Sequence, residues 1–265
     1  MKKYLAVAKI TMANYLGYRW EFVIGQLRAL LLLITLYFLW TRVFGQNLTL
    51  FSYNRHQIIT YIILAAILRQ FVITSSTEQI AGELQSWGKF FSYLLKPIGY
   101  FRYWFSVDLI YKLTNIIFIS IVAFILIIFL KISFVYPPHF TSFLMFTIST
   151  ILAVLIYFYI GILISSTGFW TSQVWGLQFL MVLVLEFAAG AYFPIDVLPL
   201  SIQSVIKLTP FPYLLYFPIN IFLGRLTFLE STRVVMVSAV WLVIIYSLTT
   251  FVWRKGLKAY EAWGG

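Results

Sequence analysis

The sequence predicts an all-α membrane protein with six transmembrane helices, and three observations lead to this fold class. Of the 265 residues, 62% are hydrophobic and only 10% are charged, whereas a soluble domain carries about 25% charged residues to cover its surface. The mean hydropathy is +0.93. The apolar residues gather in runs of about 20, the length that a helix needs to cross a bilayer. This composition excludes a soluble enzyme, a nucleic-acid-binding module and a disordered chain.

Six apolar runs are the expected membrane spans, and they fill most of the chain. They are residues 22–44, 58–75, 107–130, 142–164, 175–193 and 234–252. Each is expected to be helical, because backbone groups in lipid must be satisfied within the segment. Continuous apolar runs such as 116–130 lack the alternation of a membrane β-strand. Residues 1–265 are therefore expected to form a single transmembrane domain.

Residues 2–21, ahead of the first span, are predicted to form a helix that lies in the membrane interface. Tyr4, Tyr15, Tyr18 and Trp20 would anchor it at the level of the headgroups. Its amphipathic pattern is imperfect, so a simple extension of the first span is the alternative interpretation.

The charge balance predicts the orientation. Lys and Arg number 19 against 8 Asp and Glu, a net charge of +11, and in membrane proteins the basic residues gather at the cytoplasmic ends of helices. The side that carries the N-terminus would hold eleven of them: Lys2, Lys3, Lys9, Arg19, Lys89, Lys96, Arg102, Lys112, Arg254, Lys255 and Lys258. The other side would hold six: Arg42, Arg55, Lys131, Lys207, Arg225 and Arg233. Both termini are therefore expected in the cytoplasm, with membrane lipids rather than nucleic acid as the partner of the basic residues.

Two connections have unusual sequences. The cytoplasmic stretch 77–106 is long and carries Glu78 and Glu83, with Asp108 just after it. The outer stretch 190–230 contains five of the eight prolines, and proline stops helices. We therefore expect short re-entrant or interfacial helices in the outer stretch, covered by protein or facing a water-filled cavity.

Catalytic, cofactor-binding and metal sites are not expected in this chain. Cysteine is absent, and the two histidines, His56 and His139, are far apart in sequence. Neither an H-E-x-x-H pattern nor a phosphate-binding loop with the required glycine spacing occurs. The chain is therefore expected not to hydrolyse ATP.

Ionisable residues inside the spans are the remaining candidates, because each is costly in lipid unless it is paired or hydrated. Glu186 lies toward the outer end of the fifth span, Arg69 lies within the second and Arg28 within the first. Each has a functional interpretation, in a transport pathway, and a structural one: Arg28 extends to the interface and Glu186 pairs with a neighbouring helix. One isolated glutamate gives little support for a proton relay.

Three local patterns resemble the membrane subunit of an ABC-2 type ABC transporter. Residues 79–84 (QIAGEL) followed by 92–98 (SYLLKPI) resemble the coupling-helix region of that family. Residues 190–194 (GAYFP), followed by Leu-Pro and Thr-Pro-Phe-Pro, resemble its outer re-entrant hairpin before the last span. The tail at 256–261 (GLKAYE), with two final glycines, is similar to the ends of bacterial permeases in this group.

The resemblance implies a permease of an ATP-driven exporter in the bacterial cytoplasmic (inner) membrane. A second copy, or a homologous permease, would complete the substrate pathway, and two ABC ATPase subunits would carry the ATP and magnesium. Contact with the ATPases would involve Glu78, Gly82, Glu83, Lys89, Phe90, Phe91, Leu94 and Pro97. The pathway or its gate would involve Glu186, Phe193 and Pro194.

Two other functions stay open at this point. An ion- or proton-coupled secondary transporter would transport along a proton gradient without ATP. A non-transporting membrane assembly factor would show no substrate-stimulated ATPase activity in any complex. The absence of charge-lined spans favours an apolar or amphiphilic cargo that moves along the interface between permeases.

Overall fold

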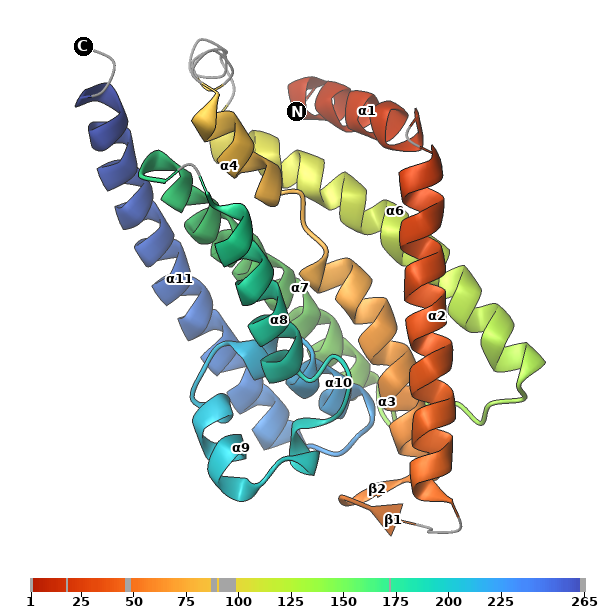
Figure 1. The fold of residues 1–265 in the computed structure, drawn as a ribbon. Helices are drawn as coiled ribbons and strands as arrows, with labels where there is room; N and C mark the ends of the chain where they lie inside the picture. Colours follow the sequence, from red (N-terminus) through yellow and green to blue (C-terminus); the bar gives the residue numbers. More distant parts are fainter. Residues whose placement is uncertain are drawn as a thin grey trace.

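The computed structural model describes residues 2–17, 19–45, 49–86, 90, 99–171 and 173–262. Most of them are helical, and Figure 1 shows the long helices side by side. The first half contains α1 (Lys2–Gly17), α2 (Arg19–Phe44), β1 (Thr49–Leu50), β2 (Tyr53–Asn54), α3 (Arg55–Leu68), the π-helix η1 (Arg69–Ile73), α4 (Glu78–Gln85) and α6 (Tyr100–Phe129). The second half contains α7 (Phe140–Ser165), η2 (Ser166–Phe169), α8 (Trp175–Ala189), η3 (Ile195–Val197), α9 (Leu200–Lys207), η4 (Phe211–Tyr213), α10 (Tyr216–Phe222) and α11 (Phe228–Ala262).

Five helices in the described part of the chain are long and apolar enough to cross a membrane. They comprise α2, the α3–α4 segment, α6, α7 with η2, and α11. The expected fifth span is shorter than the sequence indicated. It is α8, with 15 residues, or about 22 Å at 1.5 Å per residue, against a hydrocarbon core of about 30 Å. Its end is set by Gly190, which takes the left-handed conformation (φ 81°) that closes a helix.

The second expected span is not a uniform α-helix. The chain changes to π-helical geometry over η1, and Thr74 is extended (φ −68°, ψ 123°). The new helix α4 then begins at Glu78. A π-helical turn inside an α-helix is rare and is frequent at functional sites. Two other helices run beyond their apolar segments, since α6 begins at Tyr100 rather than 107 and α11 continues to Ala262 rather than 252.

The two ends of the helical bundle differ in content. Figure 1 shows α4, α1 and both chain termini at one end, and the β1–β2 hairpin and α9 at the other. α1 lies at a steep angle to α2. The Tyr15 hydroxyl of α1 and the Gln26 amide of α2 both donate to Asn115 Oδ1 of α6, at 3.0 and 2.8 Å. These bonds connect the N-terminal helix to two long helices.

The proline-rich stretch 190–230 divides into short helices, as its composition predicts. η3, α9, η4 and α10 have between 3 and 8 residues each. Their apolar residues Ile195, Leu214, Leu215 and Ile219 are fully buried in the main hydrophobic core. This segment therefore covers one end of the bundle.

Candidate functional site

The first candidate site is the outward face of α4. Its apolar residues Ile80, Ala81 and Leu84 are buried, and Gly168 of η2 permits the close approach, because a Cβ there would lie 3.3 Å from the Ala81 carbonyl oxygen. Glu78 and Gly82 are on the exposed side. The apolar face of α4 thus packs on the bundle. The opposite, mainly polar face is exposed.

A hollow of about 500 Å³ lies beside this exposed face. Glu78, Gly82 and Gln85 line it from α4, Gln173 lines it from the segment before α8, and Trp175 lines it from the first residue of α8. A Cβ built on Gly82 has no atom within 4 Å, so the glycine leaves space on the surface rather than making room for a neighbour in this chain. Glu83 is half-buried, and its carboxylate accepts a hydrogen bond from the Tyr100 hydroxyl at 3.0 Å.

Phe90 does not lie where a partner could bind it. It is only 1% exposed, and its ring lies 5.5 Å from Tyr100, 6.0 Å from Phe169 and 6.1 Å from Trp253 in edge-on contacts. The expectation that Phe90 contacts an ATPase is therefore corrected, because its aromatic ring is packed inside the chain. The other expected contact residues, Lys89, Phe91, Leu94 and Pro97, lie outside the described residues.

The second candidate site is an ion pair between two expected spans. Arg69 is the first residue of η1, and its Nε and Nη2 donate to Glu186 Oε1 of α8 at 2.8 and 2.5 Å. The Tyr192 hydroxyl donates to the other carboxylate oxygen of Glu186. The Glu186 side chain is 4% exposed and that of Arg69 is 19% exposed. The structural interpretation of Glu186, pairing with a neighbouring helix, is thus correct in geometry.

A second ion pair holds the broken helix against α6. Lys112 Nζ lies 3.3 Å from Asp108 Oδ2 one turn away, and it donates to the carbonyl oxygens of Val72 and Thr74 at 3.0 and 2.5 Å. Asp108 Oδ1 accepts from the Ser76 amide at 2.9 Å. These contacts satisfy backbone groups that the break in the helix leaves free.

The assignment of Lys112 to the cytoplasmic charges is wrong. Lys112 and Asp108 are both 0% exposed, so this lysine neutralises a carboxylate and binds carbonyls within the bundle rather than facing lipid headgroups. The i, i+4 spacing of Asp108 and Lys112 on an apolar helix was a usable signal for this pair.

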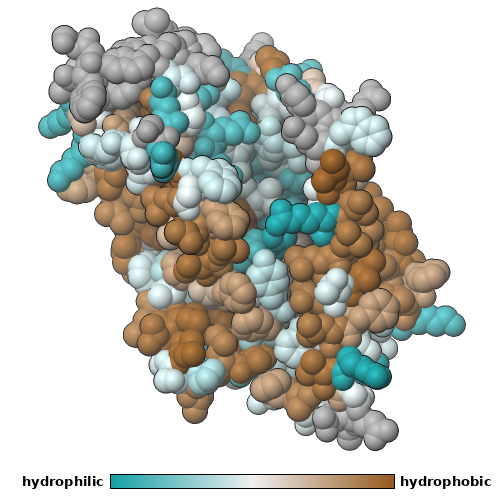
Figure 2. Space-filling model, viewed as in Figure 1, coloured by the Kyte–Doolittle hydropathy of each residue, from teal (hydrophilic) through white to brown (hydrophobic). Residues whose placement is uncertain are grey.

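The expectation that no span is lined by charge is also corrected. A cavity of about 300 Å³ lies between α2, η1 and α8, and its charged lining residues are Arg28, Arg69, Glu78 and Glu186. Figure 2 shows hydrophilic side chains in a hollow between the hydrophobic surfaces of α2 and α8. Tyr157 of α7 and Ser75 also line this cavity. Sequence reasoning named all four charged residues, three as residues of separate spans and Glu78 as an ATPase contact, but it could not bring them together.

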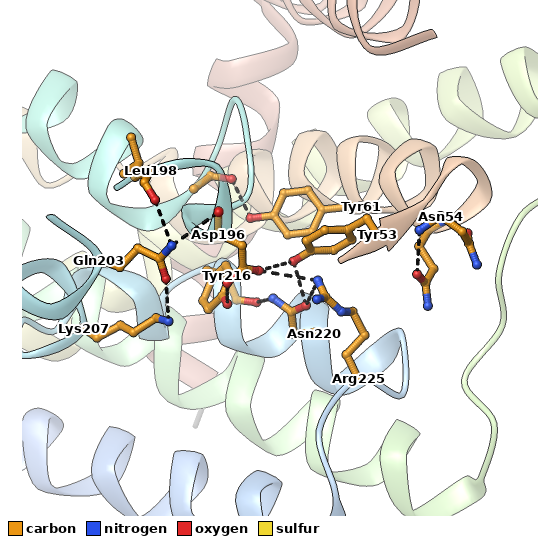
Figure 3. A network of polar contacts seen from close by, with 12 residues as sticks. Tyr53, Asn54, Tyr61, Asp196, Leu198, Gln203, Lys207, Tyr216, Asn220 and Arg225 are labelled. Carbon is orange, nitrogen blue, oxygen red and sulfur yellow. Dashed lines mark hydrogen bonds and ion pairs between the residues drawn. The ribbon is translucent and has the colours of Figure 1, made fainter. Parts of the chain in front are cut away.

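At the opposite end of the bundle a polar network surrounds Asp196, shown in Figure 3. The Tyr216 hydroxyl donates to Asp196 Oδ1 at 2.7 Å, and the Tyr53 hydroxyl lies 2.8 Å from Oδ2 and 3.0 Å from Asn220 Oδ1. Arg225 lies 3.5 Å from Asp196 Oδ2, with its guanidinium 3.4 Å from the centre of the Tyr53 ring. Burial lowers the pKa of Arg225 and, with the Asp196 carboxylate as the second cause, raises the pKa of Tyr216. The network ties the β1–β2 hairpin to the proline-rich segment.

The two remaining expected gate residues belong to the same end of the bundle. Phe193 is half-buried, with its ring 6.0 Å from that of Phe187. Pro194 is buried, and its carbonyl oxygen accepts the bond that closes η3. Both residues follow α8 closely in the chain, and Glu186 lies in the last turn of that helix.

The comparisons with known proteins agree with this architecture. Residues 30–264 match the family described as ABC-2 family transporter protein, which is 235 of the 265 residues. No curated protein matches the chain. The matched region includes the ion pair, α4 and the proline-rich segment. The chain therefore belongs to the ABC-2 family of transporter proteins, as a multi-pass permease component of an ABC transporter that associates with ABC ATPases and is not itself the ATPase.

Proposed function

We propose that this permease is half of the membrane part of an ATP-driven exporter in the bacterial cytoplasmic membrane. A second copy or a homologous permease would complete the substrate pathway, and two ATPase subunits carrying ATP and magnesium would bind the cytoplasmic side. The observation that carries the proposal is the position of α4. Its polar face is exposed at the end of the bundle where both termini lie (Figure 1).

The topology of the proposal follows from that arrangement. With α8 as a sixth crossing beside the five longer spans, the even number places both termini on one side. The lysines and arginines of the α11 end and the N-terminal helix then face the cytoplasm, in agreement with the positive-inside rule. The Asp196 network and α9 would face outward. Because α8 is shorter than the hydrocarbon core, the buried segment that follows Gly190 would complete this membrane crossing on the outer side.

Coupling to the ATPases would pass through α4 into the bundle. α4 is packed on η2 through Ile80, Ala81 and Leu84, so a movement of its surface carries the C-terminal end of α7 with it. α4 is also joined to η1 through the segment that Asp108 and Lys112 hold. A displacement at the cytoplasmic surface would thus reach Arg69 and its ion pair with Glu186. Packed elements of this kind shift between discrete arrangements rather than deforming continuously.

Substitution of Gly82 tests this function. Gly82→Gln places a side chain on the exposed face of α4, where nothing in this chain obstructs it. The variant should fold with an unchanged melting temperature. It should reduce the amount of ABC ATPase that copurifies by about tenfold or more, because a misfitting side chain at an interface core costs 1.4 kcal/mol or more. ATP-dependent transport should be lost with it.

Gly17→Gln is the matched control, since Gly17 of α1 also has no atom within 4 Å of a built Cβ and lies away from α4. It should bind the ATPase as the wild type does. Wild-type ATPase binding by Gly82→Gln would show that the outward face of α4 is not the coupling surface. Transport that follows a proton gradient without ATP would instead support the secondary transporter.

A further inference from the structure

Arg28 is an unusual residue in its surroundings. It lies six residues inside the span that begins at Phe22, about 9 Å along the helix, and its side chain is exposed. Among the described residues it has no hydrogen bond and no ion pair, whereas Arg69 in the same cavity is paired with Glu186. An arginine within the hydrocarbon region is unfavourable unless water or an anion accompanies it.

The depth of Arg28 matches that of the buried ion pair. Arg69 is 14 residues from the start of α3 at Arg55, about 21 Å along the helix. In a core of about 30 Å this leaves about 9 Å to the other face, which is the level of Arg28 on α2. The shared cavity agrees with this, because Arg28, Arg69 and Glu186 all line it. The cavity is therefore a charged recess at the level of Arg28 and Arg69.

Two charged side chains of the recess lie outside the Arg69–Glu186 ion pair, those of Arg28 and Glu78. The Glu186 carboxylate is occupied by Arg69 and Tyr192, so its charge is compensated. Glu78 lines the same cavity from the first turn of α4, beyond the break in the helix and toward the end where the termini lie. Arg28 is thus the cation left without a partner among the described residues that line the recess.

Exposed apolar residues flank Arg28 on its own helix. Ile24 and Leu31 of α2 lie one turn from Arg28 and are 63 and 56% exposed, and on α8 Val182 lines the recess. Figure 2 shows hydrophobic surface on both sides of the hydrophilic hollow. A ligand that reaches Arg28 would therefore lie between apolar surfaces.

A second copy of this chain offers no free carboxylate to Arg28 at this depth among the described residues. Asp108 and Glu186 are the acidic residues inside the bundle, and both are buried and bonded. Since no ion pair joins Arg28 to Glu78 among the described residues, a bonded partner for the Arg28 guanidinium must come from another molecule or from water.

We propose that the recess binds the acidic headgroup of an amphiphile, with Arg28 as the cation that contacts its phosphate or carboxylate and with the apolar chain lying against α2 and α8. This deepens the proposed function, since the recess would be the place where the exported molecule enters the pathway. Gly25 supports the assignment: it lines the same recess, and a Cβ there would meet no atom within 4 Å, so the space beside Arg28 is open.

Binding is tested on the purified full chain by native mass spectrometry with lipid titration. The probes are phosphatidylglycerol, which is anionic, phosphatidylcholine, which is zwitterionic, and glycerol 3-phosphate, which has the anionic group without acyl chains. Arg28→Gln should weaken phosphatidylglycerol binding about tenfold, or about 1.4 kcal/mol, and leave phosphatidylcholine unchanged. Arg28→Lys should retain most of the preference. Glycerol 3-phosphate should not compete at the same concentration.

Two further variants serve as controls. Arg42→Gln removes another exposed arginine at the far end of the same helix and should bind as the wild type does. Gly25→Leu fills the recess without removing charge and should weaken both lipids. The proposal is overturned if Arg28→Gln keeps the preference for the anionic lipid, or if Arg42→Gln loses it equally. Competition by glycerol 3-phosphate as strong as that of the lipid would assign the site to a free anion instead.

This binding experiment needs no ATPase. Loss of the lipid site with normal ATPase binding would leave the proposed function standing. A Gly82→Gln chain that binds its ATPase normally would leave the lipid result standing.

Discussion

Replacing Arg69 by glutamine should destabilise the protein more than replacing Glu186 by glutamine, although both changes break the same ion pair. The Glu186 side chain is 4% exposed, while that of Arg69 is 19% exposed and borders the cavity. Without Arg69, the buried carboxylate keeps only the Tyr192 hydroxyl as a partner. Without the Glu186 charge, Arg69 still reaches the cavity, and a glutamine oxygen at position 186 can accept one of its bonds.

The magnitudes follow from that asymmetry. Removing one partner of a buried pair costs about 3 to 5 kcal/mol when the other charge is left buried, so Arg69→Gln should cost about 3 kcal/mol. Glu186→Gln should cost about 1 kcal/mol, the contribution of one hydrogen bond. The double variant leaves no unpaired charge, and it should be more stable than the sum of the single effects predicts by at least about 1 kcal/mol.

The assay is unfolding of the purified chain from mild detergent into sodium dodecyl sulfate, followed by the fluorescence of its nine tryptophans. Arg42→Gln, a surface arginine at the end of α2, is the control and should change the free energy of unfolding by less than about 0.5 kcal/mol. An equal or larger effect of Glu186→Gln would refute the argument from exposure. Additive single effects would refute the pairing itself.

Three other predictions concern packing, pH and topology. Gly161→Ala should lower the free energy of unfolding by about 1 to 3 kcal/mol, measured in the same assay, because its Cβ would meet the Thr77 side chain; an unchanged value would mean that α7 and the helix break are not in contact. Burial raises the pKa of Tyr216 above its unfolded value near 10, so its contribution is present below pH 10 and is lost as the pH rises further. Tyr216→Phe should therefore lose less stability than the wild type between pH 9 and 11 in thermal melts, and an equal loss would contradict the assignment. Gln85→Cys should resist an impermeant thiol reagent added to intact cells and Ser201→Cys should react with it, in a chain that has no cysteine of its own; the reverse pattern would invert the topology.

The membrane spans and the helix breaks follow from local sequence. Apolar runs predict spans because lipid leaves each run only its own backbone for hydrogen bonding. Among the described residues, five apolar helices are long enough to cross a membrane, and α8, at the place of the expected fifth span, is shorter. Gly190 ends α8, and the prolines after it divide the next segment into short helices. Both residue types change the conformation that the backbone takes at their own position, so their effect can be predicted from local sequence. The family was likewise recognisable from short local patterns, and the match over residues 30–264 confirms it.

The pairing of charges was decided by the tertiary structure alone. Arg69 and Glu186 are 117 residues apart, and the composition of neither span indicates that η1 and α8 present these side chains to each other. Lys112 was assigned to a surface by its position in the chain, yet α6 turns it into the bundle, where it binds the carbonyl oxygens of the helix break. Phe90 was expected at an ATPase contact because of the family resemblance, and it is buried against α11 and η2. A span's length depends on its own residues, but the direction in which each side chain points depends on how the helices rotate and pack against one another.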